Sequence, residues 1–288
     1  MLLTFLAVFD IIYLNLEHEG GISMNNIKVA KETIRITAEG KYTLSGNTVD
    51  LPQKDYKEVI VYSPEAGAAL PDIKKDGELC RITVINADSF QAARGFDDPF
   101  VMNFANAHCP GGGFMLGANA QEEALCRCST LYASISSEKA AEMYRYNNSH
   151  ISMTESDYML LSPNVCVFRN EKCELLEMPF SAAVITIPAP NRYGAAMLAS
   201  GKLIAETMTR RMRIMLKIAA KNGYKNLILG AWGCGAFGND PSDVAGHFRT
   251  VLIDEGYGYG FDNVCFAVYG REDGRNISAF RRIFKDSL

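Results

Sequence analysis

Apolar runs alternate with helical patterns along most of the chain. Runs typical of buried strands occupy residues 79–87, 100–106, 158–168, 182–190, 226–232 and 263–270. Segments with helical spacing lie between several of them, at residues 120–137, 201–222, 241–255 and 276–284. Because strands that alternate with helices pack as a sheet between two helical layers, the pattern predicts an α/β sandwich with a largely parallel or mixed sheet.

The first part of the chain has a different pattern. Residues 25–40 carry apolar positions at helical spacing and end at Gly40, a natural helix C-cap. A second short helical piece is predicted between residues 55 and 71. We therefore expect an N-terminal accessory segment over residues 24–78 and one main domain over residues 79–288.

The N-terminal apolar stretch is interrupted by Asp10 and has no Lys or Arg before it. It is short for a membrane span and lacks the basic start and cleavage site of a signal peptide. Codons for Glu19, Gly20 and Gly21 can form a purine run like a ribosome-binding site, and Met24 follows it. We interpret residues 1–23 as a mis-assigned leader; a genuine N-terminal helix packed on the domain is the alternative. An intact native protein that begins at Met1 would contradict the leader.

Composition is that of a soluble globular protein, with 48% hydrophobic and 22% charged residues and a net charge of −4. An acidic chain is poorly suited to hold nucleic acids through a broad basic surface, so we expect no ordinary DNA or RNA binding and no membrane span. A phosphate-bearing ligand would instead be held by backbone amides and helix ends.

Eight cysteines are scattered in mostly apolar surroundings, which is typical of reduced thiols and indicates a cytoplasmic protein. Cys126 and Cys128 lie close in sequence to His108 and Cys109, but no CxxC or HxxxH pair accompanies them. We therefore expect buried thiols here and no metal.

Two glycine-rich loops follow predicted strands, where α/β folds place their ligands. The first holds Gly111 to Gly113 and is followed by Gln121, Glu122 and Glu123 at the start of a helix. Alone, this pattern favours a flexible turn before favourable acidic residues in a first helical turn. Negative side chains beside a phosphate-binding loop are unfavourable unless they take part in chemistry.

The second loop has the pattern Gly233-x-Gly235-x-x-Gly238, with Asp240 and Pro241 as N-cap and first residue of the next helix. Backbone amides in such a loop suit a diphosphate, although the motif alone also fits a tight turn without a ligand. A nicotinamide dehydrogenase would carry this motif in its first βαβ unit. Because only one strand and one helix follow it here, the pattern disfavours an oxidoreductase.

Together these motifs resemble the signature of poly(ADP-ribose) glycohydrolases of the microbial type. The stretch NFANAHCPGGGFMLGANAQEE has three glycines, a short spacer and Gln-Glu-Glu, and LILGAWGCGAFGNDP is similar to the family's second phosphate loop. The resemblance covers roughly residues 25–288. It implies a macrodomain-like three-layer α/β/α sandwich with a six-stranded mixed sheet and an N-terminal helical extension. Residues 79–288 would then be the catalytic domain, with ADP-ribose in a cleft across the sheet and no cofactor.

Carried over residue by residue, the resemblance makes Glu123 the catalytic acid and lets Glu122 hold the ribose hydroxyls beside the scissile bond. Ala87-Asp88-Ser89-Phe90 stands where the macrodomain fold usually has Gly-Asp-Ile-Thr, and Asp88 would read the adenine there. Tyr269 would also contact the adenine, with a core-edge aromatic as the alternative. Gln121 would help to fix the loop. The full ADP-ribose-binding set implied is Asp88, Asn106, Gly111, Gly112, Gly113, Gln121, Gly233, Gly235, Ala236, Phe237, Gly238 and Tyr269.

The chemistry agrees with these residues. Cleavage of a ribose–ribose link passes through an oxocarbenium-like state and needs a proton on the leaving oxygen. A carboxyl beside another carboxylate, partly desolvated, has a raised pKa and then serves as acid and base in turn. Glu122 and Glu123 provide such a pair. The resemblance further implies poly(ADP-ribose) and ADP-ribosylated proteins as partners, ADP-ribose as product and an end-on mode of attack.

Two other functions stay open at this point. One is removal of a single ADP-ribose unit by the same acid; the other is a non-catalytic ADP-ribose-binding macrodomain, against which the intact acidic pair argues. Among minor features, His108 is expected to pack the loop rather than carry protons, and Trp232 to pack in the core. Residues 210–213 (RRMR) form a helix face for which contact with polymer phosphates is an alternative.

Overall fold

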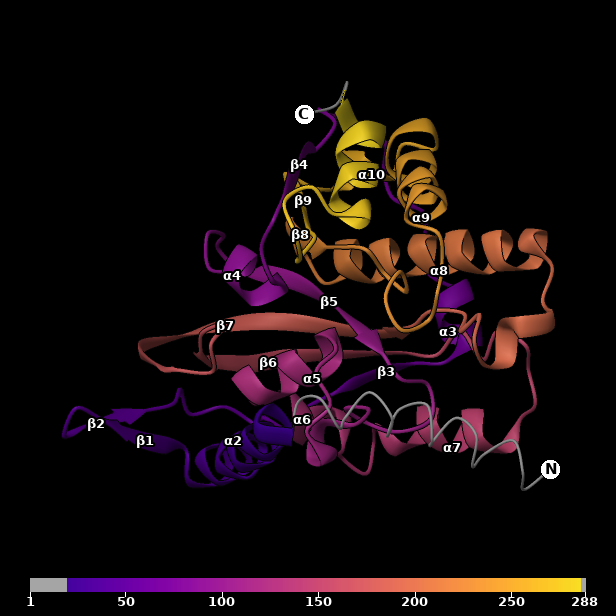
Figure 1. The fold of residues 1–288 in the computed structure, drawn as a ribbon. Helices are drawn as coiled ribbons and strands as arrows, with labels where there is room; N and C mark the ends of the chain where they lie inside the picture. The colour runs from indigo at the N-terminus through magenta and orange to yellow at the C-terminus, as the bar shows by residue number, and fades with distance from the viewer. Residues whose placement is uncertain (1–19, 286–288) are drawn as a thin grey trace.

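A seven-stranded mixed sheet runs through the molecule in the order β3-β6-β7-β5-β8-β9-β4 (Figure 1). The computed structural model describes residues 20–285. Neighbouring strands from β7 to β4 pair in parallel, whereas β6 pairs antiparallel with both β7 and β3. The strands are β3 (Ile60–Tyr62), β4 (Arg81–Ile85), β5 (Pro99–Ala105), β6 (Met159–Arg169), β7 (Leu175–Pro188), β8 (Asn226–Leu229) and β9 (Asn263–Ala267).

The predicted α/β sandwich is confirmed, but the strand number and two of the predicted helices differ from the prediction. The extra strand is β3, which pairs with β6 and comes from the N-terminal part of the chain. The helical piece expected between residues 55 and 71 is therefore a strand followed by the short helix α3 (Pro64–Ala68). Val59 to Tyr62 are half-buried or buried and rich in β-branched residues, which favours a strand.

Helices cover both faces of the sheet (Figure 1). One face packs against α8 (Gly201–Lys221), α9 (Pro241–Arg249) and α10 (Arg275–Phe284). The other carries α2 (Gly20–Glu39), α4 (Ser89–Ala93), α5 (Gln121–Cys128), α6 (Leu131–Ile135) and α7 (Ala141–Ser149). Smaller elements are the hairpin of β1 (Lys41–Leu44) and β2 (Asn47–Asp50), and the short helical turns η1 (Phe114–Leu116), η2 (Ala195–Leu198), η3 (Thr250–Asp254) and η4 (Tyr257–Gly260).

Several predicted helix ends are confirmed and one helix is split. Gly40, with φ 68°, ends α2, and Asp240 caps α9 through Ser242 N and Asp243 N. The helix expected over residues 120–137 is instead two helices, α5 and α6. Ser129 between them is extended and forms a bridge with Val167, so the chain turns toward β6 at that point.

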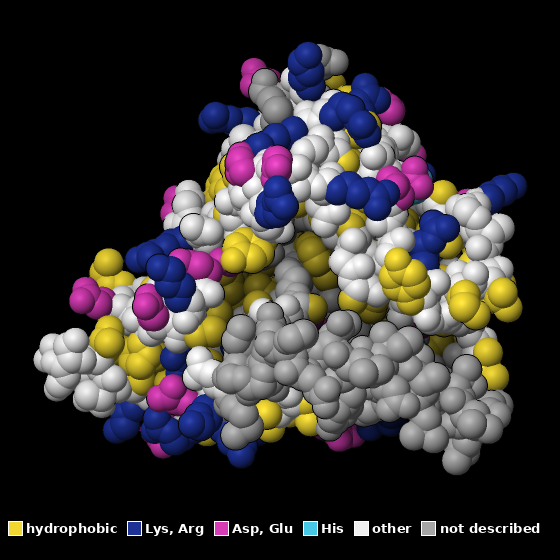
Figure 2. Space-filling view, viewed as in Figure 1, with side chains coloured by type: hydrophobic (Ala, Val, Ile, Leu, Met, Phe, Trp, Pro, Cys, Tyr) yellow, Lys and Arg dark blue, Asp and Glu magenta, His cyan; other side chains and the backbone are white. Residues whose placement is uncertain are grey.

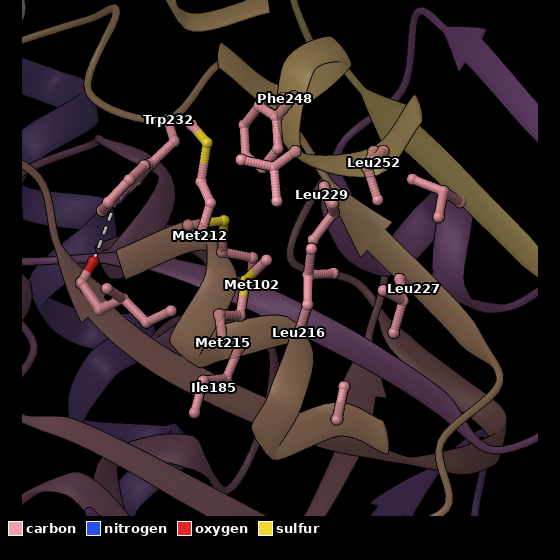
Figure 3. Packing of buried hydrophobic residues seen from close by; sticks show 14 of the residues in the cluster. Met102, Ile185, Met212, Met215, Leu216, Leu227, Leu229, Trp232, Phe248 and Leu252 are labelled. Carbon is pink, nitrogen blue, oxygen red and sulfur yellow. Dashed lines mark hydrogen bonds between the residues drawn. The ribbon is translucent and has the colours of Figure 1, made fainter. Parts of the chain in front are cut away.

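The larger core lies between the sheet and helices α8 to α10. Figure 3 shows sheet residues such as Met102, Ile185 and Leu229 meeting Met212 and Phe248 from the helices. Trp232 is fully buried among them, and its indole Nε1–H donates to Ile187 O at 3.1 Å. The expectation that this tryptophan packs in the core is confirmed.

The leader predicted for residues 1–23 falls largely on residues 1–19, which lie outside the described residues. Helix α2 begins at Gly20 and continues past Met24, and its buried Ala30, Thr33 and Ile36 face the rest of the molecule. The leader and the division near residue 78 stay predictions. Within residues 20–285, no helix combines the length and apolar character that a membrane crossing needs.

The parallel strands β4, β9, β8, β5 and β7 all end at one edge of the sheet. The loops that follow them therefore meet there, as expected for a ligand site in an α/β fold. Both glycine-rich loops lie at this edge, since one follows β5 and the other follows β8.

Candidate active site

Glu123 sits at the start of α5 and reaches back to the glycine loop. Its Oε2 accepts a hydrogen bond from Ala120 N at 3.0 Å, and its Oε1 accepts one from Gly113 N at 2.9 Å. The bond from Ala120 N is one of the two bonds of a capping box. The other bond needs a side-chain acceptor at the N-cap, which alanine lacks. With only 7% of its surface exposed, the Glu123 carboxyl is fixed between the helix and the loop.

Glu122 is buried more deeply, between α5 and β5, with 3% of its surface exposed. Its Oε1 accepts from Asn103 Nδ2 at 3.2 Å, and its Oε2 accepts from the backbone N of Asn106 at 2.8 Å. The pKa of Glu122 is raised to about 8, mainly because burial disfavours the ionised carboxyl and also because of the charge of neighbouring Glu123. Glu122 therefore holds a proton at neutral pH.

Gln121 joins the start of α5 to two other elements. Its side-chain Oε1 accepts from Phe104 N at 2.9 Å, and its Nε2 donates to Met102 O at 2.8 Å. The same nitrogen donates to Ser89 Oγ of α4 at 3.0 Å. These bonds fix the helix start against β5; the part of Gln121 in holding the loop stays a prediction.

The glycine loop is shaped to lie directly on the two carboxyls. Gly111 and Gly112 have φ values of 71° and 54°, which favour glycine. A Cβ on Gly112 would lie 2.5 Å from Glu123 Oε1 and 3.3 Å from Glu122 Oε2. Gly112 thus allows the close approach of the backbone to both glutamates.

The turn between β5 and the glycine loop is held from two sides. Asn106 Oδ1 accepts from His108 N at 2.8 Å and from Cys109 N at 3.0 Å. Asn148 of α7 donates to His108 O at 3.1 Å, and the His108 ring lies 3.0 Å from Asn148 Oδ1 and 3.8 Å from Glu155 Oε1. Glu155 raises the pKa of His108. These contacts agree with the expectation that His108 packs the loop.

The second glycine loop follows β8, the strand beside β5. Gly233 and Gly238 have φ values of 74° and 69°. Asn239 Nδ2 donates to Gly233 O at 3.2 Å and to Pro190 O at 2.9 Å, so the loop is tied to the segment after β7. Of the other loop residues predicted to contact the ligand, Gly235 and Ala236 are exposed and Phe237 is half-buried.

The two residues expected to read adenine lie farther along the edge, after β4 and β9. Asp88 caps α4, since its Oδ1 accepts from Phe90 N at 2.8 Å and Gln91 N at 2.9 Å. Its Oδ2 is buried without a hydrogen-bond partner among the described residues. Tyr269 lies two residues beyond the end of β9 and is 75% exposed. Their contact with adenine stays a prediction.

The sequence did not single out Asn103 and Thr186, which support Glu122 from within the sheet. Asn103 Nδ2 donates to Thr186 Oγ1 at 3.1 Å as well as to Glu122, and both residues are fully buried on paired positions of β5 and β7. A signal was present, because each is a polar residue inside an otherwise apolar strand run.

Residues 20–285 contain no group of three or more His, Cys, Asp or Glu side chains placed to hold a metal ion. All eight cysteines are free thiols, and Cys126 and Cys128 are buried.

At one edge of the sheet, a pair of buried carboxyls thus lies against one glycine loop, and a second glycine loop follows the neighbouring strand β8. Such a pair can exchange a proton with a sugar oxygen, and such loops can bind a diphosphate. The fold and the site together define a glycosidase of the α/β class.

Similarity to known proteins agrees with this site. A family model described as "Microbial-type PARG, catalytic domain" matches residues 30–170. The chain is 37% identical to the poly(ADP-ribose) glycohydrolase of Thermomonospora curvata, covering 91% of this chain and all of that one, with a TM-score of 0.83. The Deinococcus radiodurans enzyme in complex with ADP-ribose is 34% identical, with 83% of this chain and 100% of that one covered and a TM-score of 0.74. No curated protein matches the chain significantly.

The chain therefore belongs to the microbial-type poly(ADP-ribose) glycohydrolase (PARG) family and is a glycohydrolase. The resemblance in its two glycine loops and Gln-Glu-Glu motif is confirmed. A further solved structure similar to the chain is the Thermomonospora curvata enzyme bound to the inhibitor ADP-HPD, at 37% identity, 90% coverage of this chain, 99% of that one and a TM-score of 0.81.

Proposed function

We propose that this chain hydrolyses the ribose–ribose O-glycosidic bonds of poly(ADP-ribose), releases ADP-ribose and attacks the polymer from its end. The observation that carries the proposal is the contact of Gly112 with Glu122 and Glu123. A backbone without a side chain lies against two carboxyls there, so a ribose that packs on the glycine loop is brought close to both of them.

In this mechanism Glu123 donates a proton to the leaving ribose oxygen. Its carboxyl is held by Ala120 N and Gly113 N, so it needs no reorientation during the reaction. After the leaving group departs, the Glu123 carboxylate activates a water molecule that attacks the cationic sugar. The diphosphate of the bound unit stabilises the positive charge of that sugar.

Glu122 holds the ribose hydroxyls beside the scissile bond. With its pKa raised to about 8, it is neutral at pH 7 and both donates and accepts hydrogen bonds. A neutral Glu122 also removes one negative charge from the neighbourhood of the diphosphate. The site then carries less repulsion toward its anionic substrate than two ionised carboxylates would cause.

The rest of ADP-ribose lies along the edge of the sheet. Gly233 to Gly238 bind the diphosphate through backbone amides, Phe237 borders the distal ribose, and Asn106 and Gly111 to Gly113 pack against that ribose. Asp88 and Tyr269 contact the adenine. The enzyme acts in the cytoplasm on polymer attached to proteins, as the free thiols of its eight cysteines favour.

The test is incubation of the purified protein with poly(ADP-ribose) and, separately, with mono-ADP-ribosylated protein. Free ADP-ribose from the polymer, with short chains shrinking one unit at a time, supports the proposal. Release only from the mono-modified protein would replace it with single-unit hydrolysis. Tight ADP-ribose binding without release from either substrate would replace it with a binding module.

A further inference from the structure

The order of the strands gives the direction in which the ligand lies. The proposed adenine contacts follow β4 and β9, the diphosphate loop follows β8, and the catalytic glutamates follow β5. These strands are consecutive neighbours in the sheet, about 4.8 Å apart at each step. Continued past the scissile bond, the same direction leads to β7. This direction, which rests on the proposed function, places the leaving part of the polymer over the segment that follows β7.

That segment, residues 191–198, exposes apolar side chains. Tyr193 is 72% exposed, Met197 68% and Leu198 83%. In Figure 2, which has the same view as Figure 1, hydrophobic side chains gather on the right, where Figure 1 draws the chain leading into α8. Apolar side chains grouped beside a catalytic site are typical of a binding surface.

Tyr193 is also held in place against the diphosphate loop. A Cβ on Gly238 would lie 2.5 Å from the Tyr193 ring, so the ring rests directly on that glycine. Arg192 N donates to Phe237 O at 3.0 Å, and Tyr193 N donates to Asn191 Oδ1 at 3.1 Å. The backbone on both sides of the ring is therefore fixed, while most of the ring surface stays exposed.

The charge of this segment suits a polyanion. Arg192 is exposed and forms no ion pair with a carboxylate within residues 20–285. The 21-residue helix α8 begins at Gly201 just beyond the segment, with Ser200 as its N-cap, and its N-terminus adds positive potential. A fixed aromatic ring next to positive charge is the combination that binds bases along a phosphate backbone.

We propose that Tyr193 is a stacking platform for the adenine of the ADP-ribose unit on the leaving side of the scissile bond, and that Arg192 binds a phosphate of that unit. The platform binds polymer and leaves the terminal ADP-ribose site unaffected. It therefore distinguishes a polymer from free ADP-ribose, which fills only the terminal site.

The test compares Tyr193→Ala with Tyr193→Phe, which keeps the ring, and with Met178→Ala, an equally exposed apolar residue of β7 at 74% exposure. For Tyr193→Ala we expect a rise of about tenfold in KM for long polymer, the size typical of one lost base–aromatic stack. Its kcat and its affinity for ADP-ribose stay at the wild-type level. The other two variants behave as wild type in all three measurements.

Polymer affinity is also measured by calorimetry in the Glu123→Gln background, with and without Tyr193→Ala, so that binding is assessed apart from turnover. A tenfold loss of polymer affinity there supports the platform even if hydrolysis takes a different course than proposed. An unchanged polymer affinity overturns the platform while the hydrolysis stands. An equal loss of ADP-ribose affinity overturns it too, because Tyr193 would then only support the diphosphate loop.

Discussion

Asn103 of β5 donates a hydrogen bond to Glu122 of α5 at 3.2 Å, from a position where no surface of Asn103 is exposed. Replacing Asn103 with Ala leaves the buried Glu122 and Thr186 without their shared donor. We expect a loss of about 1–3 kcal/mol in the free energy of unfolding, the usual cost of an unsatisfied buried polar group, and a fall in turnover. Urea unfolding and ADP-ribose release measure the two effects.

Thr186→Val is the matched control for that variant. It removes the Thr186 hydroxyl, the second acceptor of the Asn103 amide, and leaves the Asn103–Glu122 bond in place. Turnover close to wild type in Thr186→Val, with a loss in Asn103→Ala, assigns the effect to Glu122. An equal loss of turnover in both variants would mean that only general packing of the strands is affected.

The raised pKa of Glu122 makes stability depend on pH in a defined direction. Its folded pKa of about 8 lies above the value of about 4.3 for an unfolded Glu. The contribution of this carboxyl to the free energy of unfolding is therefore fully present below about pH 4. It is lost as the pH rises toward 8, at up to about 1.4 kcal/mol per pH unit. Glu122→Gln does not titrate, so its Tm relative to wild type should rise steadily from pH 5 to pH 8. A Tm difference that is constant across this range would show that Glu122 is ionised throughout.

Gly112→Ala tests the contact between the glycine loop and the acid. The added Cβ would lie 2.5 Å from Glu123 Oε1 and must displace the loop or the carboxyl. We expect at least a hundredfold fall in turnover, since a misplacement of about 1 Å is enough for such a loss. The control is Gly223→Ala, which has a similar strained φ of 83° but no atom within 4 Å of the added Cβ. It should lose about 1 kcal/mol of stability and keep wild-type turnover; a fall of similar size in its turnover would point to backbone strain in general.

Two arginines of the RRMR helix face should differ in how much each stabilises the folded protein. Arg211 is fully buried and donates to Asp157 Oδ1, Pro188 O and Thr154 O, whereas Arg213 pairs with Glu255 at 35% exposure. Arg211→Met should cost about 1–3 kcal/mol of unfolding free energy for each of the buried carbonyls of Pro188 and Thr154 that it leaves without a donor, while Asp157 keeps its bonds from Arg210. Arg213→Met should cost under about 1 kcal/mol. Equal costs in thermal or chemical unfolding would contradict the burial argument.

The sequence predicted the fold class and the two glycine loops because both depend on local patterns. Apolar runs, capping residues such as Asp240 and adjacent glycines are visible without tertiary contacts. The seventh strand, β3, was missed because its short run is ambiguous until it pairs with β6.

The sequence predicted that the glycine loop and the acidic pair lie together, but not the electrostatics of the pair. Repulsion between Glu122 and Glu123 suggested a raised pKa, but burial is the larger cause, and Glu122 is the residue whose pKa it raises. Burial of that carboxyl depends on Asn103 and the glycine loop, which lie elsewhere in the sequence. Neither contact can be read from the spacing of residues along the chain.

The most direct test of the proposed chemistry is single-turnover release of ADP-ribose from poly(ADP-ribose) by Glu123→Gln beside wild type, with ADP-ribose affinity measured in parallel by calorimetry. General acid catalysis typically contributes about 10²–10⁴-fold, so the variant should release ADP-ribose slower by that factor and bind it within about threefold of wild type. Release by Glu123→Gln within tenfold of the wild-type rate would contradict Glu123 as the catalytic acid.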